Sequence, residues 1–383
     1  MYKRAIGLGF SALLFLLIVL WEGVGHVFAQ PAPGTAPAAE EPASKLKPVS
    51  YDWPHDGKIL ALAFSEDGKK AVSVNTEGLV KEWDIATGQM LRSIPHDMKI
   101  IAAAFHESSK VGLARTWDGQ NAILTRDLET GEARETLSSH GRGITALAFS
   151  PDGDYILSGG QDHHVMLWGT AYGELIGVFQ GHDDTVHAVV PSPDQERIAS
   201  IAADKSIRLW NISNSETVLS FKPHKKGVST LAFSPDGEFL VSGGQDKIKP
   251  ALVYSVALWD LSKKKWWQFS KKPVRSLGEH DAEITMTLFS PDGKAVLVAD
   301  RAGNLSVVDM ISGKPIQILE SDQKDVATGA FSFDGRLVLS AGSGKVLLWN
   351  ISKDPVLVRG ATSAPTTEPG TKQKGKAKGR RKR

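Results

Sequence analysis

The chain of 383 residues contains no cysteine, which excludes disulfides, thiolate metal sites and a cysteine nucleophile. It also lacks several short motifs that carry enzyme chemistry, namely HExxH, GxSxG outside the N-terminal region, and a Rossmann fingerprint after a strand. The sequence SAGSGKV around Lys345 lacks the first glycine and the Ser or Thr of a phosphate-binding loop. With 41% hydrophobic and 23% charged residues, the composition is that of a globular protein, so a wholly disordered or collagen-like chain is excluded as well.

Acidic residues are missing from the segment Lys372–Arg383, which carries eight positive charges. The formal charge of the whole chain is +2, so setting this +8 segment aside leaves −6 on the rest. Like charges repel and there is nothing apolar to bury, which predicts an unfolded tail over residues 360–383. We expect the tail to bind acidic surfaces, with lipid headgroups or an acidic envelope surface favoured over nucleic acid and over a purely solubilising role.

The N-terminal region differs again in composition. Residues 1–29 have a basic start, an apolar run, and small residues at Val27 and Ala29, which is typical of a secretory signal peptide. An uncleaved membrane anchor is the alternative, because about 20 apolar residues can span a bilayer. Residues 30–45 are rich in proline and alanine and are expected to form an extended linker. We therefore expect an exported protein, periplasmic or extracellular, that is either cleaved after Ala29 or anchored by this segment.

The region between these ends repeats one unit seven times. Each unit has a Trp-Asp pair or a variant of it, and most units have a His before the pair and a turn such as FSPDG between the two. The pairs begin at Trp83, Arg126, Trp168, Trp210, Trp259, Val308 and Trp349. Ser-Pro-Asp-Gly suits a tight turn because Pro fixes φ, Asp bonds to nearby backbone and Gly tolerates unusual angles. The β-rich runs on either side predict strands joined by hairpins, in four-stranded units that must cover one another.

These markers resemble the WD-repeat family of seven-bladed β-propellers, the family of the G-protein beta subunit. The resemblance covers about residues 46–359 and implies an all-β fold with four antiparallel strands per blade. It also implies a hydrogen-bonded tetrad of His, Ser or Thr, Asp and Trp inside a blade. Three tetrads match fully: His140, Ser158, Asp162 and Trp168 in blade three, His182, Ser200, Asp204 and Trp210 in blade four, and His224, Ser242, Asp246 and Trp259 in blade five.

The other blades depart from this pattern. The departures are Thr76 or Glu77 in place of Asp in blade one, Arg126 and Val308 in place of Trp in blades two and six, and Asp322 in place of His in blade seven. We therefore expect blades three to five to be the stiffest part of the ring. Two segments could supply the outer strand of the last blade, Lys47–Trp53 or Pro355–Arg359. The N-terminal segment is favoured, because it precedes His55 as a strand precedes His224 and because the family closes its ring this way.

Histidines outside the repeat markers offer little chemistry. His163, His164 and His187, with Asp183 and Asp184 nearby, would suit a loose metal or proton-sensitive patch, but no short ligand motif fixes their geometry. Ordinary turn positions explain these residues better. We predict no catalytic residue, no metal site and no cofactor.

Blade five is irregular, with insertions between Asp246 and Trp259 and between Trp259 and His280. The second insertion contains KKKWWQFSKK, whose two Trp residues either cover the blade edge or form a basic aromatic contact site. The resemblance favours a noncatalytic, monomeric scaffold that presents a loop face to a protein partner; the alternative is an enzyme or ligand sensor with a site in the propeller channel. The expected contact residues are Arg142, Gln161, His163, Asp184, Lys226, Gln245, Trp266 and Trp267.

Overall fold

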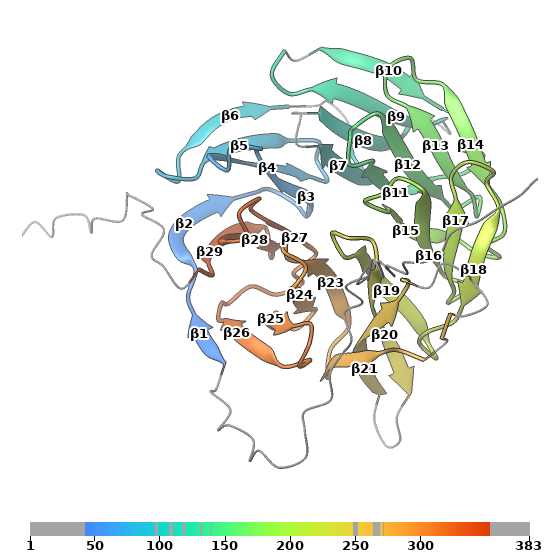
Figure 1. Ribbon diagram of the computed structural model, residues 1–383. Helices are drawn as coiled ribbons and strands as arrows, with labels where there is room; N and C mark the ends of the chain where they lie inside the picture. Colours follow the sequence, from blue (N-terminus) through green and yellow to red (C-terminus); the bar gives the residue numbers. More distant parts are fainter. Residues whose placement is uncertain are drawn as a thin grey trace, which may run out of the picture. The chain divides into compact units, whose positions relative to one another are not determined.

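The computed structural model describes residues 43–352, except 96–98, 107–109, 118–119, 131, 139, 248–251, 263–268 and 271. The regular elements in these residues are all β-strands. They form seven sheets around a ring, which confirms the predicted seven-bladed propeller (Figure 1). The predicted signal segment, the tail and the Trp266-Trp267 pair lie outside the described residues.

Each blade runs from an inner strand to an outer strand. Blade one contains β3 (Ile59–Phe64), β4 (Lys70–Asn75), β5 (Val80–Asp84) and β6 (Met90–Ile94), and blade two contains β7 (Ala102–His106), β8 (Lys110–Trp117), β9 (Gln120–Asp127) and β10 (Ala133–Leu137). Blade three contains β11 (Ile144–Phe149), β12 (Tyr155–Gly160), β13 (Val165–Gly169) and β14 (Leu175–Phe179), and blade four contains β15 (Val186–Pro191), β16 (Arg197–Ala202), β17 (Ile207–Asn211) and β18 (Thr217–Phe221).

The remaining blades use both ends of the described chain. Blade five contains β19 (Gly227–Phe233), β20 (Phe239–Lys247), β21 (Leu252–Asp260) and β22 (Arg275–His280). Blade six contains β23 (Ile284–Phe289), β24 (Ala295–Asp300), β25 (Leu305–Asp309) and β26 (Pro315–Leu319), with β1 (Ser44–Leu46) as a fifth strand. Blade seven contains β27 (Thr328–Phe331), β28 (Leu337–Gly342), β29 (Lys345–Asn350) and β2 (Val49–Pro54).

The core lies between neighbouring blades. All six residues of β24 are buried, as expected for a strand covered on both faces. Leu157 of blade three shares one apolar cluster with Val189 and Ile198 of blade four. The inner strands of successive blades contact one another around the ring, and β27 contacts β3 to close it. Each blade is therefore stabilised by its neighbours and not by its own core.

The repeated Ser-x-Asp-Gly turns join the inner strand to the next one. In blade three the Ser150 hydroxyl donates to Asp152 Oδ1 at 2.5 Å, and the Tyr155 N–H donates to Ser150 Oγ at 2.9 Å. Gly153 has φ of 73°, a conformation that side chains disfavour. Inner strands therefore end at these turns, on what we call the turn face. They begin at the opposite face, where the tetrad His and Asp lie, which we call the tetrad face.

Ring closure follows the favoured prediction. Strand β2 pairs antiparallel with β29, with Trp53 opposite Val346. Trp53 is fully buried and its ring stacks on Trp83 of blade one at a centroid distance of 5.2 Å. The closing strand therefore joins blade seven to blade one as well as completing blade seven.

Strand β1 was not predicted. It pairs in parallel with β26 of blade six, and Lys45 Nζ forms a 2.7 Å ion pair with Glu320. The chain thus runs along the outer edge of blade six before it completes blade seven.

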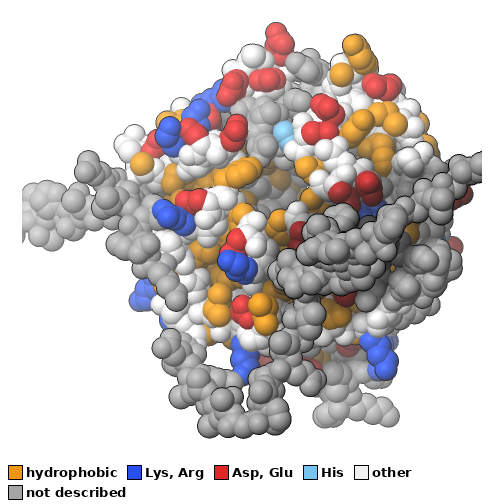
Figure 2. All heavy atoms as spheres, in the orientation of Figure 1, with side chains coloured by type: hydrophobic (Ala, Val, Ile, Leu, Met, Phe, Trp, Pro, Cys, Tyr) orange, Lys and Arg blue, Asp and Glu red, His pale blue; other side chains and the backbone are white. Residues whose placement is uncertain are grey.

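Charged side chains are distributed unevenly over the surface. On the face drawn in Figure 2, acidic side chains gather toward the upper right, over blades two and three. Lys and Arg lie mainly along the left and lower edges of the same view. The charges on this face are therefore not spread evenly.

Candidate functional site on the tetrad face

The tetrads organise the tetrad face. In blade three, His140 Nδ1 lies 2.9 Å from Asp162, and His140 Nε2 lies 2.7 Å from Ser158 Oγ. The Trp168 indole N–H donates to the same Oγ at 2.8 Å. Because the carboxylate can only accept, Nδ1 carries the proton, the Ser158 hydroxyl donates to Nε2, and its oxygen accepts from the indole. One hydroxyl therefore satisfies two buried rings.

Blades four and five repeat this geometry. His182 contacts Asp204 and Ser200 at 2.9 and 2.7 Å, and Trp210 donates to Ser200 at 2.8 Å. In blade five, the corresponding distances are 3.0 Å for both His224 contacts and 2.9 Å for the Trp259 donor. The structure thus brings together all twelve residues of the three sets.

Charge in the tetrads is fixed by burial and hydrogen bonding together. Burial alone would raise the pKa of Asp162, but hydrogen bonds from His140 and from backbone N–H groups outweigh it and hold the pKa below its usual value. The pKa of Asp204 is likewise lowered, with burial opposed by Ser206 and His182. Burial lowers the pKa of His182 more than Asp204 raises it. The tetrad of blade four therefore holds a neutral imidazole against a carboxylate.

Blade one lacks the carboxylate. His55 Nε2 lies 2.6 Å from Ser73 Oγ, and Trp83 donates to that oxygen at 3.0 Å. His55 Nδ1 is buried with no hydrogen-bond partner in the described part of the chain. Burial, assisted by the charge of Lys81, lowers the pKa of His55 to about 4.

Blades six and seven use other residues to satisfy the buried polar groups at the tetrad positions. In blade six, His280 Nδ1 lies 3.1 Å from Asp300, a carboxylate that the sequence pattern did not single out. In blade seven the prediction that Asp322 takes the place of His is wrong. Asp322 is exposed, and the buried Gln323 instead accepts from Ser340 Oγ at 2.7 Å, while Trp349 donates to that oxygen at 2.9 Å. An amide can replace imidazole here because it offers both a donor and an acceptor.

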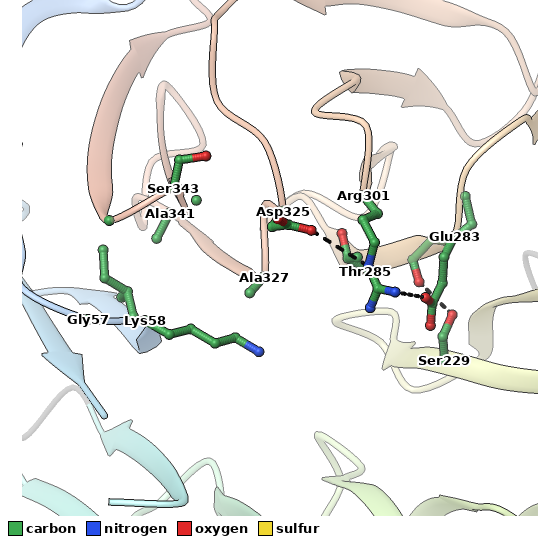
Figure 3. Close-up of a pocket in the computed structure, with 14 residues that line it drawn as sticks. Gly57, Lys58, Ser229, Glu283, Thr285, Arg301, Asp325, Ala327, Ala341 and Ser343 are labelled. Carbon is green, nitrogen blue, oxygen red and sulfur yellow. Dashed lines mark hydrogen bonds and ion pairs between the residues drawn. The ribbon is translucent and has the colours of Figure 1, made fainter. Parts of the chain in front are cut away.

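A cavity of about 660 Å³ opens on the tetrad face, where the inner strands of blades one, five, six and seven begin. Figure 3 shows Arg301 lying between two carboxylates and Lys58 reaching into the open space. Arg301 contacts Glu283 at 2.7 Å and Asp325 at 3.7 Å. Lys58 is exposed, and its ammonium has no hydrogen bond or ion pair within the described residues. Among the described residues that line the cavity, the Lys58 ammonium is therefore the one cation without an ion pair, whereas Arg301 is paired with two carboxylates.

The hydroxyl groups at the cavity bridge blades. Ser229 Oγ donates to Ile284 O of the next blade at 2.5 Å, and Thr285 Oγ1 donates to Val326 O. Among the described residues that line the cavity there is neither histidine nor cysteine. These hydroxyls therefore hold neighbouring inner strands together, since each donates its hydrogen to a backbone carbonyl of the next blade.

The predicted contact residues that lie in the described part of the chain share this face but do not line the cavity. Arg142, Asp184 and Lys226 are exposed at the starts of blades three, four and five. Gln161 follows β12 and donates its N–H to Gly143 O, and Gln245 lies near the end of β20 and accepts from the Lys226 N–H. Arg301 occupies the repeat position of the two glutamines, so comparing that position in every blade would have found it.

The loose histidine group does not assemble into a metal site. His164 Nδ1 lies 3.8 Å from Asp162, His163 sits in the turn with φ of 69°, and His187 is exposed on β15. The described residues hold no cluster of three or more His, Asp or Glu suited to a metal ion. Nor do they include a helix with the length and apolar character needed to cross a membrane.

Comparison with known proteins identifies the repeats. The family model described as WD domain, G-beta repeat matches residues 131–169, 173–211, 215–248 and 313–350. The first three matches each begin at or just before an outer strand and run into the following blade, and the last one ends with β29.

Several curated proteins are similar to parts of the chain. U3 snoRNP-associated protein-like YAOH of Oryza sativa subsp. japonica is 27% identical over 129 residues, which is 33% of this chain and 20% of that protein. WD repeat-containing protein 36 of Homo sapiens is 28% identical over 129 residues, 33% of this chain and 14% of its own length. Eukaryotic translation initiation factor 3 subunit I of Pyricularia oryzae is 44% identical over 46 residues, 12% and 14% respectively. The chain spans a fifth or less of the length of these relatives.

These relatives overturn the prediction of an exported, periplasmic or extracellular protein. The names of the Oryza and Pyricularia proteins associate them with a small nucleolar ribonucleoprotein and with translation initiation, which are nuclear or cytoplasmic. An apolar N-terminal run is therefore a poor guide to location here. What the repeats, the sheets and the tetrads agree on is the architecture: the chain is a seven-bladed β-propeller, and four of its segments match the WD domain, G-beta repeat.

Proposed function

We propose that this propeller is a noncatalytic scaffold that binds a protein partner on its tetrad face, centred on the cavity beside Lys58. The observation that carries the proposal is the exposed Lys58 ammonium, which has no partner among the described residues and lines the same cavity as the paired Arg301. A cation in a concave, partly apolar site is suited to an acidic group on a partner. Relatives named as associated with U3 snoRNP support an interaction role.

The outer contacts would come from the rim of the same face. Arg142, Asp184 and Lys226 are exposed there, and Gln161, His163 and Gln245 stand beside them. We propose that these residues set specificity, since rim charges steer association more than they add affinity. The segment Lys372–Arg383 would add contacts to acidic surfaces, and the propeller would act as a monomer.

The test is affinity capture of the tagged full chain from its native cells, with Lys58→Glu compared with Lys69→Glu. Both substitutions change the charge by the same amount, but Lys69 lies on the turn face, where it pairs with Asp67. We expect K58E to lose specific co-purifying proteins and K69E to keep them. An unchanged set with K58E, from protein with unchanged thermal stability, would place the partner elsewhere.

A ligand sensor is the second candidate, because a cavity of about 660 Å³ lies in the size range of small-molecule sites. Thermal stabilisation by a small anionic metabolite that K58E abolishes would support it. Partner capture without any such stabilisation would favour the scaffold.

A further inference from the structure

The turn face carries a pattern of charge that the proposed function does not use. The residue after the Ser-x-Asp-Gly or equivalent turn is basic in three consecutive blades around the ring and acidic in three others. The basic positions are Lys294, Arg336 and Lys69 in blades six, seven and one, and the acidic positions are Asp154, Glu196 and Glu238 in blades three, four and five. At this position the turn face is therefore basic over blades six, seven and one and acidic over blades three to five.

Ion pairing sharpens this division. In blades six, seven and one the basic residue pairs with the turn Asp at 3.7, 3.8 and 3.2 Å. In blades three to five the turn Asp and the following acid are all exposed, and Arg197, which contacts Asp194 at 3.1 Å, is the one cation paired with them in the described residues. We call these six acids the acidic crescent: Asp152, Asp154, Asp194, Glu196, Asp236 and Glu238.

A groove of about 540 Å³ runs through the acidic crescent between blades four and five. Four of the six acids line it. Glu196, Asp236 and Glu238 have no cationic partner within the described residues. Arg197 also lines the groove, but it is paired with Asp194, so the charges left unpaired in the groove are acidic. A concave site with an excess of one sign of charge concentrates its field and attracts the opposite sign.

The chain leaves the ring on this same face. After β29 the Ile351 N–H donates to Arg336 O in the turn of blade seven, at 2.9 Å. Residues 353–371 then separate the propeller from Lys372, and fully extended they span up to roughly 65 Å. A globular domain of about 310 residues has a radius of gyration near 20 Å, so this connection is long enough to reach blades three to five.

We propose that the acidic crescent is the docking surface for the chain's own basic segment Lys372–Arg383. The eight positive charges of this segment meet six acids that otherwise lack neutralising partners, apart from the Arg197–Asp194 contact. The short connection holds the segment at a high effective concentration, so weak contacts to exposed acids suffice. The association is electrostatic and weakens steeply with salt. An acidic partner of the basic segment must therefore compete with the propeller for it.

Energy transfer in the full chain tests the proposal, because the absence of cysteine allows two labelling sites to be introduced cleanly. One dye is placed at Arg383→Cys and the other at Tyr172→Cys, in the outer turn of blade three, or at Phe333→Cys, in the turn of blade seven. Both positions are exposed, at 81% and 62%. The chain leaves the ring beside Phe333, so an undocked segment gives greater transfer to Phe333→Cys. Docking gives greater transfer to Tyr172→Cys.

The matched variant D154K/E196K/E238K gives blades three to five the basic residue found in blades six, seven and one, so the fold is expected to tolerate it. We expect transfer to Tyr172→Cys to fall about twofold in this variant and also in about 0.5 M salt, where screening shortens the range of surface charges to a few ångströms. Transfer that is greater to Phe333→Cys and unaffected by both changes would overturn the proposal. Transfer seen between singly labelled chains when they are mixed would overturn it in favour of docking between copies.

Discussion

At the scale of single residues, the serine hydroxyl is the hub of each tetrad. Ser158→Ala would leave His140 Nε2 without a donor and the Trp168 N–H without an acceptor, both of them buried. Each unsatisfied buried group costs about 1–3 kcal/mol, so for two groups we expect the free energy of unfolding to fall by about 2–6 kcal/mol. The fall is measured by urea-induced unfolding of the full chain.

Ser213→Ala is the control for this prediction. Ser213 is exposed, and its hydroxyl donates to Asn211 within its own turn. Its loss should change the free energy of unfolding by less than about 0.5 kcal/mol. If S158A were as mild as S213A, the tetrad would not contribute to stability.

Because His55 Nδ1 is buried without a partner in the described residues, we expect the stability of the fold to depend on pH. The pKa of His55 is about 4 in the folded chain, below its usual 6.5. Between these values the unfolded chain binds a proton that the folded chain resists, so stability falls as the pH drops from about 6.5 to 4. The tetrad carboxylates, whose pKa values are lowered from an already acidic value, affect stability only below this window.

Asn75→Asp should weaken this dependence on pH. Asn75 follows His55 at the spacing by which Asp300 follows His280 in blade six. A carboxylate there would accept from His55 Nδ1 and raise its pKa, which reduces the stability lost on acidification. Urea midpoints at neutral pH and near pH 5 measure the effect. His55→Gln, which removes the titrating group, should also reduce the loss; equal losses in all three chains would contradict the assignment.

The sequence could predict three tetrads because their spacing is constant and the hydroxyl, carboxylate and rings recur together. The role of Gln323 was missed because this residue lies one position after the expected one and is chemically unlike His. The partner of His280 was also missed, because Asp300 contacts this ring from the end of the second strand and not from the following turn. The roles of Lys58 and Arg301 could not be predicted, because only the assembled ring brings these two residues from different blades to one cavity.

At the scale of elements, β2 is expected to be essential to the ring and β1 dispensable. A chain that begins at Lys47 loses β1, which contributes three paired residues and one exposed ion pair. A chain that begins at His55 also loses β2 and with it the buried Trp53. Removing a buried Trp alone costs about 3–5 kcal/mol. Thermal unfolding should show a small shift for the first truncation and loss of the cooperative transition for the second.

Equal stability of the two truncated chains would show that the ring does not depend on this closure. The closing strand could be predicted from the sequence because its distance to His55 repeats that of other outer strands. Strand β1 could not, because three residues carry no alternation and its pairing depends on backbone groups of β26.

At the scale of the whole molecule, stiffness should vary around the ring. Blades three to five have complete tetrads, whereas blade one has a His55 nitrogen without a partner in the described chain and blade seven has Gln323 in place of the tetrad His. Amide exchange should therefore be slowest in β12, β16 and β20, because local opening there breaks more buried hydrogen bonds. Hydrogen exchange with mass spectrometry measures this, and fastest exchange in blades three to five would refute it.

The path of β1 also has a mechanical consequence. Tension applied at residue 43 is borne first by the three residues paired with β26 and by the Lys45–Glu320 contact. Strand β2, locked by Trp53 against Trp83, is loaded only after β1 has detached. Under load, β1 is therefore expected to detach from β26 first, while β2 stays paired and the ring stays closed.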